Sequence, residues 1–168
     1  SPLALAQANE VRNKILSFND LDPYDVEIKV IKTSGDKFLN TSLSKIGGKG
    51  LFTKEIQQAL IDKRIDIAVH SMKDVETELP EKLVISTILE REDVRDSFIS
   101  RKYSSIAELP MGSVVGTSSL RRKAQLLNKR NDLEVVEFRG NVQKRLEKLD
   151  NNVAVATFLA TAGLNRLG

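Results

Sequence analysis

The sequence contains no cysteine and only one histidine in 168 residues. Without cysteine, this chain can form no disulfide, thiolate nucleophile or cysteine metal site of its own. The one histidine, His70, has no second histidine or cysteine with which to share a metal, so we interpret it as a hydrogen-bonded core residue. No apolar run reaches the roughly 18 residues of a membrane helix, and no signal peptide is visible. We therefore expect a soluble, cytoplasmic protein with no metal site.

The net charge of +3 is unevenly distributed. Residues 1–100 contain 14 Lys and Arg against 17 Asp and Glu, whereas residues 101–168 contain 12 against 6. A basic half indicates an anionic partner, which is a phosphate, a nucleic acid or a polycarboxylate, unless it is only a solvated surface. Aromatic residues make up 5% of the chain, and the basic residues fall in loops after strands instead of in a stripe. Both features disfavour a nucleic-acid binder.

Hydrophobic periodicity predicts alternating strands and helices along the chain. The predicted strands are 26–32, 65–70, 83–89, 112–116, 133–138 and 153–160. The predicted helices are 1–16, 51–64, 117–130, 142–149 and 161–168. This alternation predicts an α/β fold with mixed, mainly parallel sheets and flanking helices.

A polar segment, "EREDVRDS", coincides with the change of charge and predicts a domain boundary. We expect an N-terminal lobe at residues 1–92 and a basic lobe at residues 93–168. The chain opens directly on a helix cap, which suggests that the first lobe lacks an initial strand. The short final helix suggests that the second lobe is also incomplete.

The motif "GTSSLRR" follows the predicted strand 112–116, and ligands of open α/β sheets bind beyond such strand ends. Thr117, Ser118 and Ser119 lie where a helix N-terminus attracts anions. Arg121 and Arg122 add forked donors that suit carboxylates or phosphates. The alternative is an ordinary helix cap followed by two surface arginines.

The motif "RGN" follows the predicted strand 133–138 in the same way. It contains Arg139, Gly140 and Asn141, and Arg145 lies one turn into the next helix. Together with the arginines of "GTSSLRR", these residues suggest a ligand with several carboxylates.

Lys73 and Asp74 follow the predicted strand 65–70. In a crevice, Asp74 could accept a hydrogen bond from a ligand N–H, stabilise a developing cation or pass a proton. The alternative is a surface ion pair of little consequence. A glycine-rich loop, "KIGGKG" at 45–50, could cradle a phosphate but lacks the spacing of a P-loop.

Taken together, the motifs resemble those of the porphobilinogen deaminase (hydroxymethylbilane synthase) family. The matching stretches are "SPLALAQA", "GGKGLFTKE", "IDIAVHSMKDV", "EREDVRDSF", "GTSSLRRKAQL", "FRGNVQKRLEKLD" and "ATAGLNRLG". The resemblance implies two lobes similar to periplasmic binding proteins and a third domain whose cysteine carries a dipyrromethane cofactor. Since this chain has no cysteine, we expect that third domain to be absent from it. The resemblance also implies that the first lobe lacks its return segment.

The resemblance implies a transferase of tetrapyrrole (heme, porphyrin) biosynthesis. Such an enzyme joins four porphobilinogen molecules head to tail, with loss of ammonia, into linear hydroxymethylbilane. It implies that Asp74 hydrogen-bonds pyrrole N–H groups and stabilises the cationic species formed as ammonia leaves. The residues implied to bind cofactor or substrate are Ser1, Lys45, Lys49, Phe52, Lys73, Thr117, Ser118, Ser119, Arg121, Arg122, Arg139, Gly140, Asn141 and Arg145.

Three further expectations follow from the resemblance. The full-length protein should act as a monomer on a small molecule, without nucleic acid or membrane. The present chain alone should be inactive. A non-catalytic two-lobed binding module for organic polycarboxylates remains the alternative function, and it would not need Asp74.

Overall fold

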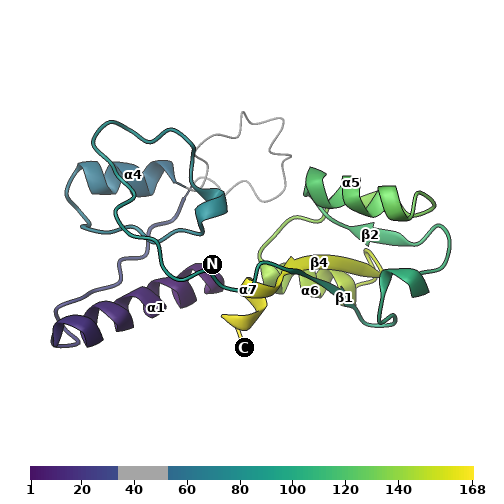
Figure 1. The fold of residues 1–168 in the computed structure, drawn as a ribbon, viewed down its shortest axis with the longest axis horizontal. Helices are drawn as coiled ribbons and strands as arrows, with labels where there is room; N and C mark the ends of the chain where they lie inside the picture. Colours follow the sequence, from purple (N-terminus) through teal and green to yellow (C-terminus); the bar gives the residue numbers. More distant parts are fainter. Residues whose placement is uncertain (34–52) are drawn as a thin grey trace. The chain divides into compact units, whose positions relative to one another are not determined.

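The computed structural model describes residues 1–33 and 53–168, which divide into two compact units, Ser1–Glu90 and Arg91–Gly168 (Figure 1). Lys45, Lys49 and Phe52 lie outside the described residues. In the described part of the chain, no helix is both long enough and apolar enough to cross a membrane.

The first unit is built around the helices α1 (Pro2–Asn19) and α4 (Lys54–Ile61). The hydroxyl of Ser1 accepts the N–H of Ala4 at 3.2 Å, so the predicted cap of α1 is confirmed. Arg12 on α1 donates from Nε to the carbonyl of Val26 at 2.8 Å, which holds the segment after α1 against the helix. A single turn of 3-10 helix, η1 (Met72–Asp74), follows α4.

The three strands predicted for this unit are wrong. Residues 26–32, 65–70 and 83–89 form no strand ladder with any described residue. Their β-branched side chains include Val30, Val84 and Ile88, which are 69%, 81% and 73% exposed. Strand propensity largely reflects packing against cross-strand and same-face neighbours. A segment with an alternating apolar pattern therefore does not form a strand where no neighbouring strand pairs with it.

The second unit contains a four-stranded sheet in the order β1-β4-β2-β3 (Figure 1). The strands are β1 (Asp96–Ser100), β2 (Val114–Gly116), β3 (Glu134–Val136) and β4 (Ala156–Ala160). The pairs β2–β3 and β2–β4 are parallel, whereas β1–β4 is antiparallel. The predicted α/β class with a mixed, mainly parallel sheet is thus confirmed for this unit.

Helices cover both faces of this sheet. Leu126 of α5 (Leu120–Lys129) packs in one core cluster with Val115 and Ala156. Leu149 of α6 (Val142–Asp150) packs in a second cluster with Phe138 and Ala154. Adjacent strand residues point to opposite faces, so Val115 joins the first cluster and Val114 packs against the second. The last helix, α7 (Thr161–Asn165), directly follows β4.

Strand β1 was not predicted from the sequence. It lies at the end of the polar segment that we interpreted as a domain boundary. Its antiparallel pairing with β4, from Asp96 opposite Ala160 to Ser100 opposite Ala156, supplies the partner that makes this segment a strand.

Gly116 leaves no room for a side chain against Phe138 in this core. A Cβ atom added at Gly116 would lie 2.3 Å from the ring of Phe138, which is fully buried. We expect Gly116→Ala to lower the free energy of unfolding by about 1–3 kcal/mol, because overpacked cores must shift side chains or backbone. Chemical denaturation measures this loss. A Phe138→Leu background should reduce it, and an equal loss in both backgrounds would contradict the clash.

Candidate functional site

The start of α5 is organised by the hydroxyl groups of "GTSSLRR". Thr117 is buried, and its Oγ1 accepts the N–H of Ser119 at 3.2 Å. Ser118 Oγ accepts the N–H of Phe138 at 2.9 Å, which ties this turn to the chain after β3. Ser119 is the N-cap of α5, with its Oγ 3.4 Å from the N–H of Arg122. The helix start predicted at this motif is confirmed, and its cap fixes where the two arginines leave the helix.

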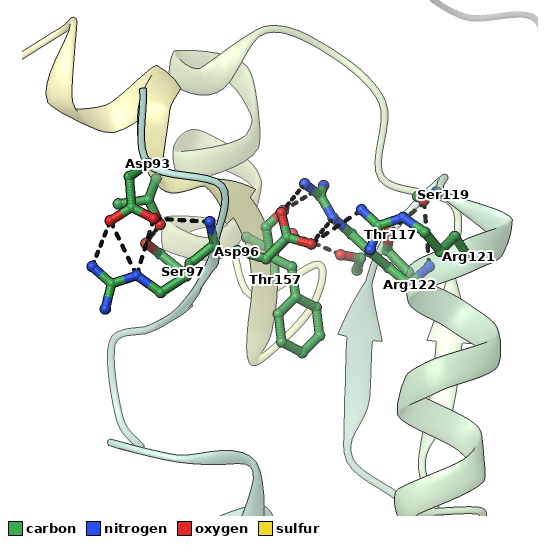
Figure 2. A network of polar contacts seen from close by, with 12 residues as sticks. Asp93, Asp96, Ser97, Thr117, Ser119, Arg121, Arg122 and Thr157 are labelled. Atoms are coloured by element: carbon green, nitrogen blue, oxygen red, sulfur yellow. Dashed lines mark hydrogen bonds and ion pairs between the residues drawn. The ribbon is translucent and has the colours of Figure 1, made fainter. Parts of the chain in front are cut away.

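Asp96, the first residue of β1, pairs with both arginines of the motif (Figure 2). Arg122 donates to it from Nη2 at 2.6 Å and from Nε at 2.9 Å. Arg121 donates from Nη2 at 3.3 Å. The side chains of Arg122 and Arg121 are 12% and 63% exposed, so the two neighbouring arginines lie in very different environments.

Arg145 on α6 extends the cluster of positive charge. Its Nε donates to the carbonyl of Gly140 at 2.9 Å, and Gly140 has a φ of +123°, a conformation that favours glycine. Burial lowers the pKa of Arg145, and the charges of Arg122 and Arg139 lower it further. Asn141 caps α6 by accepting the N–H of Lys144 at 2.9 Å. The structure therefore brings Arg122 and Arg139 each within electrostatic reach of Arg145, and an anion would relieve the repulsion.

Lys73 and Asp74 belong to the first unit, where both are exposed on η1. The N–H of Asp74 donates to the carbonyl of Ser71 at 2.9 Å, and this bond closes the turn. Ser71 in turn shares side-chain hydrogen bonds with Gln7 of α1, at 3.0 and 3.2 Å. We expected Lys73 and Asp74 to follow a strand at residues 65–70, but that segment does not form a strand with any described residue.

His70 is half-buried next to this turn. Burial lowers its pKa, and the charge of Asp74 acts in the opposite direction. The lowered pKa favours a neutral imidazole near neutral pH. No cluster of three or more candidate metal ligands occurs within residues 1–33 and 53–168.

Asp96 is the residue of this site that the sequence interpretation missed. A signal was present, because Asp96 lies in the quoted motif "EREDVRDSF". We interpreted that stretch as a boundary and assigned no role to its carboxylates. Ser1 was predicted to bind ligand, and in the structure its side chain caps α1.

Acid should destabilise the second unit below about pH 4. The hydrogen bonds from Arg122 lower the pKa of Asp96, those from Arg130 lower that of Asp132, and Arg95 lowers that of Asp93 to about 2. A carboxyl with a lowered folded-state pKa adds stability above its ordinary pKa of about 3.9. That stability is lost as the pH falls through the folded-state value.

The measurement is the thermal midpoint of the chain between pH 5 and about pH 2. Asp96→Asn should make the fall in midpoint over this range shallower, because one of the responsible carboxylates is then absent. A parent and variant that lose midpoint in parallel would contradict the assignment to Asp96.

The fold and this geometry define the second unit as an α/β unit with a cluster of guanidinium groups suited to an anion. Residues 1–168 match the family model described as "Porphobilinogen deaminase, dipyromethane cofactor binding domain". The chain belongs to the porphobilinogen deaminase family, as the motifs indicated.

Individual relatives agree with this membership. The chain is 60% identical to the porphobilinogen deaminase of Paracoccus denitrificans over 168 residues, which is all of this chain and 54% of the relative. It is 58% identical to the chloroplastic porphobilinogen deaminase of Pisum sativum over 170 residues, covering 99% of this chain and 46% of the relative. The corresponding rice protein is 59% identical. The chain thus spans about half the length of these relatives.

Proposed function

We propose that the protein containing this sequence is a porphobilinogen deaminase. It would join four porphobilinogen molecules head to tail, with loss of ammonia, into hydroxymethylbilane for tetrapyrrole biosynthesis. The observation that carries this proposal is the cluster of Arg122, Arg139 and Arg145, in which burial lowers the pKa of Arg145 and the charges of Arg122 and Arg139 lower it further. A pyrrole substrate with acetate and propionate side chains offers the carboxylates that such a cluster attracts.

The side chains of the cluster also fit a dipyrromethane cofactor, which carries the same kinds of carboxylate. Arg121, Arg122, Arg139 and Arg145 would supply positive charge, and the capped N-terminus of α5 would add its free N–H groups. When bound, the cofactor supplies the attachment point for the growing pyrrole chain. Because the chain has no cysteine, its own residues can hold that group only non-covalently.

Asp74 is the residue that we assign to the chemistry. Loss of ammonia leaves positive charge on the substrate pyrrole, and a carboxylate stabilises that charge as it develops. Lys73 carries the wrong charge for this task, so we assign it to binding carboxylates. Gly140 and Asn141 position Arg145 and the start of α6, through the contacts described above.

Two aspects of the wider architecture belong to the same proposal. We propose lobes at residues 1–92 and 93–168 of the periplasmic-binding-protein type. We further propose a cytoplasmic monomer in which Lys45, Lys49 and Phe52 take part in binding cofactor or substrate.

The proposal is tested with purified full-length deaminase containing this sequence. We expect consumption of porphobilinogen with release of one ammonia for each molecule consumed. The 168-residue chain is the control, and it should show no turnover, because it has no cysteine for the cofactor. Binding of porphobilinogen by the full-length protein without ammonia release would instead favour the non-catalytic polycarboxylate-binding module.

A further inference from the structure

The two oxygens of the Asp96 carboxylate are used unequally (Figure 2). Oδ1 accepts from Arg122 Nη2 at 2.6 Å. Oδ2 accepts from Arg122 Nε at 2.9 Å and from Arg121 Nη2 at 3.3 Å. Arg122 therefore makes a short two-point contact with Asp96, whereas Arg121 makes one long contact.

Arg122 is committed to the fold of the second unit. Besides its two bonds to Asp96, it donates from Nη1 to the carbonyl of Phe158 on β4 at 3.1 Å. Three of the donor groups of a guanidinium are thus engaged within a side chain that is 12% exposed. Turning Arg122 toward a ligand would break all of these bonds at once.

Arg121 is placed to exchange partners. Its side chain is 63% exposed, and its only ion pair with a described residue is the 3.3 Å contact to Asp96. Exposed pairs of this kind contribute little to stability. A hollow of about 160 Å³ borders the same carboxylate, and its lining includes Asp96, Arg122, Gln125 and Phe158.

We propose that Asp96 is a positioning residue of the anion site. Asp96 keeps Arg122 in place, and its contact with Arg121 breaks when a ligand carboxylate binds Arg121. This rests on the proposed function, because it assumes that the arginine cluster binds the carboxylates of a ligand. Asp96 then acts as an internal competitor for Arg121. It lowers the affinity of the site for carboxylates, and it also keeps the side chain of Arg122 from turning toward the ligand.

The test measures binding of tricarballylate, an unreactive tricarboxylate, to full-length deaminase containing this sequence. Asp96→Asn removes the competing charge and keeps a side chain that can still accept a hydrogen bond from Arg122. We expect calorimetry to show a dissociation constant about two- to fivefold lower than that of the parent, the range for one exposed ion pair. Most of that gain should disappear in an Arg121→Gln background, and it should shrink as salt is added.

Asp132→Asn is the matched control. Asp132 also pairs with an arginine, Arg130, at 2.7 Å, and its side chain is 22% exposed against 24% for Asp96. It follows the C-terminal end of α5, whereas Arg121 and Arg122 lie in the first turn. The control loses the same charge and a similar pair, yet its affinity for tricarballylate should match that of the parent.

A purely structural role for Asp96 predicts the opposite sign. Weaker binding in Asp96→Asn, a gain equal to that of Asp132→Asn, or no binding of tricarballylate by the parent would each overturn the proposal. If Asp96→Asn fails to fold, the proposal is tested by the carboxyl ¹³C resonance of Asp96 in the parent. It should shift on saturation with tricarballylate, and an unchanged resonance would overturn the proposal. Turnover of porphobilinogen by the parent reports separately on the proposed function.

Discussion

Asp74→Asn is expected to reduce turnover of porphobilinogen by about a hundredfold or more, the cost of losing one electrostatic stabiliser of a transition state. The substitution keeps the shape of the side chain and removes its charge. Since the positive charge on the pyrrole grows as ammonia leaves, the interaction strengthens toward the transition state and changes the rate more than the binding. Single-turnover kinetics on full-length deaminase already loaded with cofactor measures this effect.

Two matched variants sharpen this test. Asp74→Glu keeps the charge one methylene further out, so it should retain more activity than Asp74→Asn. Lys73→Gln, on the same turn, should weaken binding more than the chemical step. Asparagine outperforming glutamate would show that Asp74 is not the electrostatic centre.

The pKa of His70 gives an independent measure of the Asp74→Asn substitution. The charge of Asp74 raises the pKa of His70 against the larger effect of burial. Asp74→Asn should therefore lower that pKa further, which a titration followed by NMR would detect. This result would confirm that the variant keeps the local structure, so that a loss of turnover can be assigned to the missing charge.

Arg122→Leu is expected to lower both stability and binding. It removes the two bonds to Asp96 and the bond to the carbonyl of Phe158. Among the described residues, the long contact from Arg121 is then the one ion pair left to the carboxylate of Asp96. Hydrogen bonds to charged groups contribute about 1.5–3 kcal/mol, and we expect a loss of that size in urea denaturation. Cofactor loading or the Michaelis constant for porphobilinogen should also worsen, by about tenfold or more.

Arg121→Leu separates the two effects. Its exposed side chain should contribute less than about 1 kcal/mol to folding, so this variant should lose affinity while it keeps its stability. Equal loss of stability in both variants, or unchanged binding in both, would contradict the different roles that we assign to these neighbours.

Local sequence features were sufficient to predict the helices and the cap of the first one. Ser1 accepts an N–H within the first turn of α1, as its position before a helical run indicated. Ser119 and Asn141, which were predicted only as ligand-binding residues, cap α5 and α6 in the same way. The strands around Val115, Val135 and Thr157 were also predicted, since each contains a run of apolar or β-branched residues between turn residues. Family membership followed from contiguous motifs, which need no tertiary information.

Pairing across the chain decided the rest. Residues 26–32 and 83–89 have the strand pattern and no ladder among the described residues, whereas the polar segment at Asp96 is a strand because β4 lies beside it. The sequence by itself determined the capped helices, the basic half and the arginine motifs. Only the tertiary structure decided that Asp96 makes a two-point contact with Arg122 and a single long contact with Arg121. These arginines lie 26 and 25 residues away from Asp96 in the sequence. The physical reason is that this strand ladder and this ion pair each need a partner from a distant part of the chain, which local periodicity does not encode.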